Sequence, residues 1–352
     1  MKHVLRVTLL LLLIGLVMPL VAQEKTLTIG VDQEAIGLDP HIVTAFSSHR
    51  RIDLLYNKLV RHDEDLKIVP DLAESWEIPN NTTYIFNLRK GVKFHNGIEL
   101  TADDVIFSLN RILDPKTAAP GRSYITSIKS MEAISPYQVK ITLSAPLASF
   151  LEGLSSNNCA IVSKAAVEQY GNLQKVEVGT GPFILKEWIP DNSMTLVKNS
   201  NYFDKGLPYL DKVIFRVIPE QASLFAGVKS GTLDIAQIND GSTVLLAKRD
   251  PNLIVMQKPG INLRTFGFNV TRKPFDDERV RQAISLAIDR NEIIAAAEFG
   301  MAQPSGPIPA GATQWALPLN RLPFYTPDLA KAKSLLSQAG FPNGLSLKIV
   351  CS

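Results

Sequence analysis

The chain has 352 residues, of which 45% are apolar and 20% are charged, and its formal net charge is +3. These values are ordinary for a globular protein, and they exclude a disordered chain or a long coiled coil. The length permits two domains. No run of five or more basic residues occurs, so nucleic acid is not an expected partner.

The N-terminus has the layout of a secretory signal. Basic residues in the first six positions precede an apolar run from Leu9 to Val21. This run is shorter than the roughly 20 residues that a membrane-spanning helix needs. We therefore expect a signal peptide over residues 1–22 and a periplasmic protein, with an uncleaved anchor as the alternative. No cysteine lies near residue 22, so lipid attachment is not expected.

The segment up to residue 143 mixes strand and helix patterns. Thr26–Val31 is typical of a short buried strand, and the apolar spacing over His49–Val60 predicts a helix. Asn80-Asn81 predicts a hairpin turn before a strand at Tyr84–Leu88. A second helix is expected to begin after Thr101, because Asp104 three positions later completes a capping box. The last expected elements of this segment are the end of that helix before Asp114-Pro115 and a strand at Val139–Leu143.

The next segment predicts a compact α/β unit. It contains paired strands at residues 183–188 and 194–197, a strand at 213–218, a helix at 220–229 and a strand at 233–236. Gly231 is well placed to end that helix.

After residue 264 the pattern changes again. We expect a strand at 264–270, a helix at 276–289, a helix from Thr326 to Gln338 and a strand at 345–350. A strand at a chain end needs neighbours, and few other strands are predicted here. The second lobe is therefore expected to be incomplete.

Motifs for catalysis and for metal or cofactor binding are absent from the sequence. There is no HExxH, no P-loop, no GxGxxG after a strand and no GxSxG. A metal trio of His41, His49 and His62 is an open alternative, although surface or capping roles are favoured. Cys159 and Cys351 form no metal-binding spacing, and whether they pair stays open. We expect a non-enzyme without a cofactor or a metal, with an exported hydrolase as the competing hypothesis.

Three blocks of the chain resemble the extracytoplasmic solute-binding family 5, the peptide- and nickel-binding components of ABC importers. The blocks include PDLAESWEI (70–78), VGTGPFILKEWIP (178–190) and FGFNVTRKPFDDERVRQAISLAIDR (266–290). The resemblance implies an α/β, two-lobed periplasmic-binding-protein-like fold of type II, in the large cluster with an extra subdomain. The first lobe would be residues 23–261, with an inserted subdomain at about 46–175. The truncated second lobe would be residues 262–352.

The resemblance also implies what the protein binds and where. A solute, for which a di- or oligopeptide is favoured over nickel or another metal chelate, a sugar or an opine, would bind between the lobes. A monomer would deliver it to the membrane permease of an ABC transporter. The expected ligand-binding residues are Thr44, Phe46, Asn239, Phe268 and Asn269. The acidic group that captures a peptide amino terminus in similar proteins is expected to follow Ser352.

Overall fold

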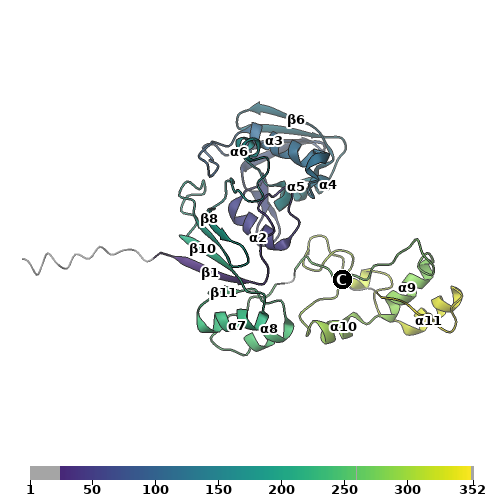
Figure 1. Ribbon diagram of the computed structural model, residues 1–352. Coiled ribbons are helices and arrows are strands. Elements are labelled where there is room, and N and C mark those ends of the chain that lie inside the picture. Colours follow the sequence, from purple (N-terminus) through teal and green to yellow (C-terminus); the bar gives the residue numbers. More distant parts are fainter. Residues whose placement is uncertain (1–23, 259, 350–352) are drawn as a thin grey trace, which may run out of the picture. The chain divides into compact units, whose positions relative to one another are not determined.

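The computed structural model describes residues 24–258 and 260–349 (Figure 1). The expected signal peptide and Cys351 therefore lie outside the described residues. The chain separates into two compact units, with the division between Gln237 and Ile238. Within the described residues, no helix has both the length and the apolar character needed to cross a membrane.

The first unit contains a five-stranded mixed sheet with the strand order β11-β1-β10-β9-β8. Strand β1 runs parallel to both β10 and β11, whereas β9 is antiparallel to β10 and β8. The strands are β1 (Thr26–Val31), β8 (Phe183–Ile189), β9 (Ser193–Lys198), β10 (Lys212–Val217) and β11 (Ile235–Ala236). The strands expected from the sequence are confirmed here, with β11 shorter than expected.

Helices cover both faces of this sheet (Figure 1). Gly30 faces α7 (Gln221–Ser230), and a Cβ atom on Gly30 would lie only 2.6 Å from the side chain of Leu224. The lack of a side chain at Gly30 thus lets the helix approach closely. On the other face, Arg51 from α2 (Phe46–Leu55) places its guanidinium 4.6 Å from the ring centroid of Phe215. Gly231 ends α7 with a φ of 76°, as expected.

The inserted part of the first unit is built on a four-stranded antiparallel sheet with the order β4-β5-β7-β6. Its strands are β4 (Ala73–Asn80), β5 (Thr83–Leu88), β6 (Ile128–Ser135) and β7 (Gln138–Leu143). Alternate residues of β5 and β7 are buried, because one face of the sheet packs on α3 (Ala102–Leu113). The predicted hairpin at Asn80-Asn81 and the capping box of Thr101 and Asp104 are both confirmed.

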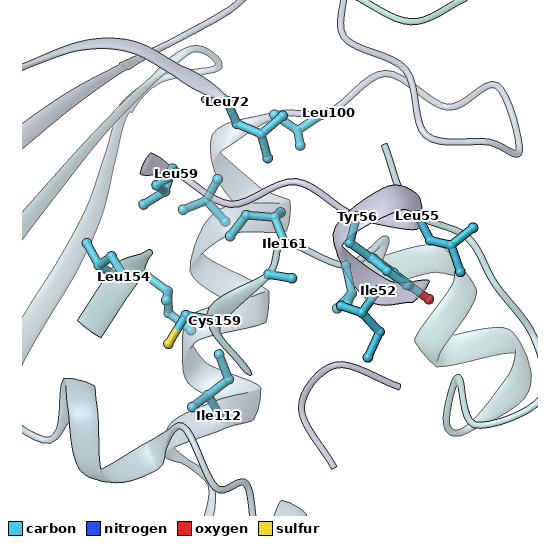
Figure 2. Packing of buried hydrophobic residues seen from close by; sticks show 14 of the residues in the cluster. Ile52, Leu55, Tyr56, Leu59, Leu72, Leu100, Ile112, Leu154, Cys159 and Ile161 are labelled. Atoms are coloured by element: carbon cyan, nitrogen blue, oxygen red, sulfur yellow. The ribbon is translucent and has the colours of Figure 1, made fainter. Parts of the chain in front are cut away.

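Short elements complete the first unit around a single apolar core (Figure 2). They are β2 (Val60–His62), β3 (Ile68–Pro70), η1 (Pro115–Thr117), α4 (Arg122–Ile125), α5 (Phe150–Leu154), η2 (Asn157–Cys159) and α6 (Lys164–Tyr170). The core includes Cys159, and burial raises the pKa of its thiol to about 12.

The helix expected over His49–Val60 is wrong in its bounds. The helix α2 begins at Phe46 and ends at Leu55, because Tyr56 adopts an extended backbone. The backbone N–H groups of Leu72 and Ala73 bond to the carbonyl groups of Lys58 and Leu59, which keeps that segment extended. The apolar residues Tyr56, Leu59 and Val60 of this segment continued the apolar spacing of the helix in the sequence.

The second unit is mainly helical in its described part. It contains α8 (Gly241–Ala247), α9 (Glu278–Ala287), α10 (Arg290–Ala297), η3 (Leu319–Arg321) and α11 (Leu329–Gln338). Its small core joins Ala283 and Leu286 of α9 to Ala332 of α11. The strands expected at 264–270 and 345–350 are wrong where the structure describes them, because neither segment pairs with another strand. Asp328, rather than Thr326, caps α11.

Candidate ligand-binding site

Three parallel strands of the first unit end at the same edge of the five-stranded sheet. Strand β1 ends at Val31, β10 at Val217 and β11 at Ala236. Their pairing continues one residue further, because the N–H of Ile218 donates to the carbonyl of Val31. Ligands of open α/β sheets bind beyond the carboxyl ends of the strands. This edge, with the loop that follows β1, is therefore the candidate site of the first unit.

A buried ion pair holds the loop that follows β1 against the interior of the first unit. The guanidinium of Arg111, on α3, donates to both carboxylate oxygens of Asp39 at 2.9 and 2.7 Å. The backbone N–H of Leu173 donates to the same carboxylate at 3.0 Å. Burial raises the pKa of Asp39, but these donors outweigh burial and the net pKa is lowered. Asp39 is thus a fixed anion inside the protein.

His41 extends this network as a neutral side chain. Its Nε2 lies 2.8 Å from the carbonyl oxygen of Ala160, so Nε2 carries the proton and donates. Its Nδ1 accepts from Arg111 at 2.9 Å. Complete burial, together with the charge of Arg111, lowers the pKa of His41 to about 4. Both ring nitrogens are occupied, which argues against the metal trio, and the described residues contain no cluster suited to a metal ion.

The supported loop exposes two of the expected ligand-binding residues. The side-chain amide of Asn158 donates to the carbonyl groups of Pro40 and Val43 at 2.7 and 2.9 Å. Directly after this anchored stretch, Thr44 is exposed and Phe46 is 61% exposed. The structure therefore places Thr44 and Phe46 together on a rigid base.

The neighbourhood of Phe46 contains residues that the sequence did not single out. The guanidinium of Arg50 lies 5.4 Å from the ring centroid of Phe46. Arg51 beside it is buried, donates to the carbonyl groups of Ser47 and Gln33, and has its pKa lowered to about 10 by burial. The sequence did carry one signal for the burial of Arg51. Arg51 lies four residues before Leu55, which places it on the apolar face of the helix.

The carboxylate of Glu34 ties the loop to the β8–β9 hairpin. It accepts from the indole Nε1 of Trp188 at 2.6 Å and from the backbone N–H of Asp191 at 3.0 Å. The two carboxylate oxygens of Glu34 thus fix the loop against strand β8 and the turn that follows it. The indole of Trp188 thus has a structural role as a hydrogen-bond donor.

The other three expected residues belong to the second unit. Asn239 is exposed and precedes Asp240, which caps α8. Phe268 is half-buried, with its ring centroid 5.5 Å from that of Phe266 and 5.4 Å from that of Phe275. Asn269 is exposed, and its Oδ1 accepts from the N–H and the hydroxyl of Thr271 at 3.2 and 2.7 Å. Phe268 and Asn269 are neighbours, whereas Asn239 belongs to a separate segment.

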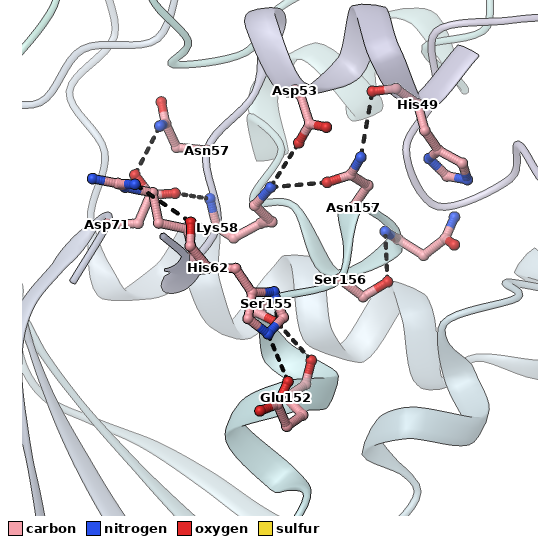
Figure 3. Close-up of polar contacts among 12 residues, drawn as sticks. His49, Asp53, Asn57, Lys58, His62, Asp71, Glu152, Ser155, Ser156 and Asn157 are labelled. Atoms are coloured by element: carbon pink, nitrogen blue, oxygen red, sulfur yellow. Dashed lines mark hydrogen bonds and ion pairs between the residues drawn. The ribbon is translucent and has the colours of Figure 1, made fainter. Parts of the chain in front are cut away.

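A serine, a histidine and a glutamate form a hydrogen-bonded chain elsewhere in the first unit (Figure 3). The Oγ of Ser155 lies 3.2 Å from Nδ1 of His62, and Nε2 of His62 lies 2.6 Å from Oε2 of Glu152. This pattern bears on the hydrolase alternative, because a nucleophile and base in hydrogen-bond contact would be its signature.

The position of Ser155 fits a helix cap rather than a nucleophile. Ser155 follows the C-terminal end of α5, it is only 5% exposed, and its hydroxyl also donates to the carbonyl of Glu152 at 2.7 Å. A C-terminal helix end presents carbonyl oxygens, whereas an oxyanion intermediate needs N–H donors. The hydrogen bonds among Ser155, His62 and Glu152 therefore anchor α5 to β2.

A second polar cluster lies beside the Ser155–His62–Glu152 hydrogen bonds (Figure 3). The ammonium of Lys58 contacts the side chains of Asp53 and Asn157 at 2.9 and 2.8 Å. Asp71 accepts from the amide of Asn57 and from the backbone N–H of Lys58, both at 2.8 Å. Burial raises the pKa of Asp71 despite these donors. The cluster links α2 to η2 and to the segment before β4.

Comparison with known proteins identifies the class. The family described as "Bacterial extracellular solute-binding proteins, family 5 Middle" matches residues 67–350. The glutathione-binding protein GsiB of Escherichia coli K12 is 32% identical over 324 residues, which cover 92% of this chain and 63% of GsiB.

Two solved structures are similar over most of the chain. The periplasmic binding protein DppA from Helicobacter pylori, in complex with the peptide STSA, has a TM-score of 0.76 and 33% identity. The alignment covers 91% of this chain and 67% of DppA. The binding protein AgaA from A. tumefaciens R10, in complex with agropinic acid, has a TM-score of 0.78 and 32% identity, with coverage of 91% and 65%.

The chain belongs to family 5 of the bacterial extracellular solute-binding proteins. The expected family and the expected α/β binding-protein fold class are therefore confirmed. The chain spans slightly less than two thirds of the length of the curated relatives that it matches.

Proposed function

We propose that this protein captures a small solute between two lobes and delivers it to the permease of an ABC transporter. Family membership carries this proposal, because the similar proteins bind glutathione, a peptide and agropinic acid. The supported loop of the first unit adds to it. A rigid base beneath exposed Thr44 and Phe46 lowers the ordering cost when a ligand binds.

The favoured ligand is a di- or oligopeptide. Bound peptides extend a sheet-like pattern of backbone hydrogen bonds, and water fills the side-chain pockets so that varied sequences are accepted. Nickel or other metal chelates, sugars and opines are the competing ligands. We propose Thr44 and Phe46 as first-lobe contacts, and Asn239, Phe268 and Asn269 as contacts of the remaining chain.

We further propose that the protein works in the periplasm, as a monomer and without catalysis. The signal-like residues 1–22 support export. The helix-cap role of Ser155 weakens the hydrolase alternative. The proposed lobes are residues 23–261, with the inserted subdomain at about 46–175, and residues 262 onward.

Native mass spectrometry of the full-length protein purified from its host tests the ligand class. We expect a retained peptide that is released on denaturation with an unchanged mass. A retained sugar, opine or metal chelate would overturn the peptide and leave solute binding intact. A retained peptide that is cleaved on incubation, with Ser155→Ala abolishing the cleavage, would replace the binding protein with the hydrolase.

A further inference from the structure

Arg50 lies on the same face of α2 as Phe46, because the two residues are four positions apart in the helix. The guanidinium of Arg50 lies 5.4 Å from the ring centroid of Phe46, and Phe46 is 61% exposed. Stacking on an aromatic ring favours one orientation of the planar guanidinium. Arg50 is therefore an oriented cation beside one of the proposed ligand contacts.

The guanidinium of Arg50 is not saturated with hydrogen bonds. Its Nη1 atom is buried and has no hydrogen-bond partner among the residues that the structure describes. The nitrogen atoms of an arginine side chain can donate but cannot accept. A buried donor without an acceptor is unfavourable, so an acceptor supplied by a solute would be stabilised at Nη1.

Arg51, the next residue, shows how an arginine with a structural role differs. It is 1% exposed, and its guanidinium donates to the backbone carbonyl groups of Ser47 and Gln33. Its Nε also lacks a partner among the described residues, but a side chain this deeply buried cannot meet a solute. Arg50 is only half-buried, so its guanidinium is accessible from the surface of the first unit.

The acidic residues of the loop that follows β1 do not satisfy Nη1 of Arg50. Glu34 uses its two carboxylate oxygens to accept from Trp188 and from the backbone of Asp191. Burial lowers the pKa of Arg50 and the charge of Asp32 raises it, with a net lowering. A further anion beside the guanidinium would offset the burial of its charge.

Arg50 is fixed at the sheet edge that forms the candidate site. Asp32, whose charge acts on Arg50, directly follows the last residue of β1. The backbone N–H of Ile36 in the same loop donates to Oγ of Ser48 on α2 at 3.0 Å. The helix and the loop are thus tied together where ligands of open α/β sheets bind.

We propose that Arg50 binds a carboxylate group of the solute, with Nη1 as a donor, and so gives the site a preference for acidic over neutral solutes. The planar fork of a guanidinium matches the two oxygens of a carboxylate. This inference rests on the proposed function and narrows it. Peptides and opines carry carboxylates, whereas an uncharged sugar does not. In a peptide, the carboxylate comes from the chain end or from an acidic side chain.

Calorimetric titration of the full-length protein with three synthetic peptides tests the preference and distinguishes these two sources. Ala-Ala-Ala carries a carboxylate only at its chain end, and the C-terminal amide of Ala-Glu-Ala carries one only on a side chain. The C-terminal amide of Ala-Ala-Ala carries none. We expect one of the two acidic peptides to bind about tenfold more tightly than the neutral peptide, as is typical of a hydrogen bond to a charged group.

The variant Arg50→Gln should weaken binding of that acidic peptide about tenfold and leave binding of the neutral peptide unchanged. Arg50→Lys should keep only part of the preference, because an ammonium keeps the charge but lacks the planar fork. Arg89→Gln is the matched control. Arg89 also stacks on a phenylalanine, 5.3 Å from the ring centroid of Phe203, but its Nε already donates to the carbonyl of Asp71 at 2.7 Å. This control should keep the full preference.

The outcomes separate this inference from the proposed function. Equal binding of the three peptides to the parent protein would overturn the role of Arg50 and leave peptide binding intact. A preference that survives in Arg50→Gln would do the same. If none of the three peptides binds, the peptide proposal falls and the inference falls with it.

Discussion

The two units of this chain differ in what holds their elements in place. In the first unit, strands pair across long sequence separations, and a large core buries residues such as Phe86 and Leu109 completely. In the described part of the second unit, helices α9 and α11 pack around a core of only a few buried residues, and large apolar side chains such as Ile254 are exposed. Local signals were therefore enough to predict helices in both units, whereas strands required partners.

Core truncation should separate the units most clearly. Phe86 is fully buried between its sheet and the helices of the first unit, so we expect Phe86→Ala to lower the free energy of unfolding by about 3–5 kcal/mol. Leu286→Ala in the second unit is the matched change, and it should cost less because its cluster is small and partly open. Hydrogen exchange read by mass spectrometry reports each unit separately, and equal losses would contradict the comparison.

Ion pairs should show the same contrast. Arg111→Leu leaves the buried Asp39 carboxylate without its cation, and we expect a loss of about 3–5 kcal/mol in the first unit. Arg279→Leu removes the exposed partner of Asp277 in the second unit and should have a much smaller effect. The two variants are compared by urea denaturation. A larger loss from Arg279→Leu would refute the structural role given to the Asp39 network.

Acid should weaken the first unit through His41. The pKa of His41 is about 4 in the folded protein and about 6.5 in the unfolded chain. The contribution of His41 to the free energy of unfolding is therefore complete above pH 6.5 and is lost as the pH falls toward 4. The full loss amounts to about 3 kcal/mol. All five histidines precede residue 96, so the second unit has none to titrate.

The variant His41→Asn provides the check on this acid effect. It removes the titrating group, and the first unit should then show a flatter dependence of hydrogen exchange on pH between 4 and 6.5. Asp39 still titrates, but its lowered pKa places its loss below the ordinary range of aspartate. The same slope in His41→Asn as in the parent protein would show that the histidine is not held neutral.

Substitutions of helix caps should give the smallest loss of stability, and this loss should be equal in the two units. Thr101→Ala in the first unit and Asp328→Ala in the second each remove a side chain that satisfies helix N–H groups or completes a capping box. We expect a loss of about 1 kcal/mol in both cases, because capping depends on neighbouring residues alone. Thermal denaturation measures both. A clear difference between the two caps would mean that tertiary context decides local stability as well.

Much of the fold followed from local chemistry in the sequence. The capping box at Thr101, the hairpin at Asn80-Asn81 and the glycine end at Gly231 depend on a few adjacent residues, and each is confirmed. The end of α2 was missed because apolar residues continue past Leu55 into an extended segment. The strand pattern at 264–270 was misleading, since a strand also needs a partner to pair with.

The candidate site was predicted only in part. The position of Thr44 and Phe46 followed from the family resemblance, but the support beneath them did not. Asp39 and Arg111 are 72 residues apart in the chain, so nothing in their spacing indicates that they meet. The buried charge of Arg51 was missed for a related reason, because its partners are backbone carbonyls, which have no sequence signature.

Calorimetric titration of the solute retained by the full-length protein tests the central claim most directly. We expect Phe46→Ala to weaken its binding about tenfold, as is typical when an aromatic contact is removed. Tyr209→Ala is the control, because Tyr209 is 77% exposed elsewhere in the first unit. Its affinity should match that of the parent protein. Unchanged binding in Phe46→Ala, or an equal loss in both variants, would contradict a ligand site at the loop after β1.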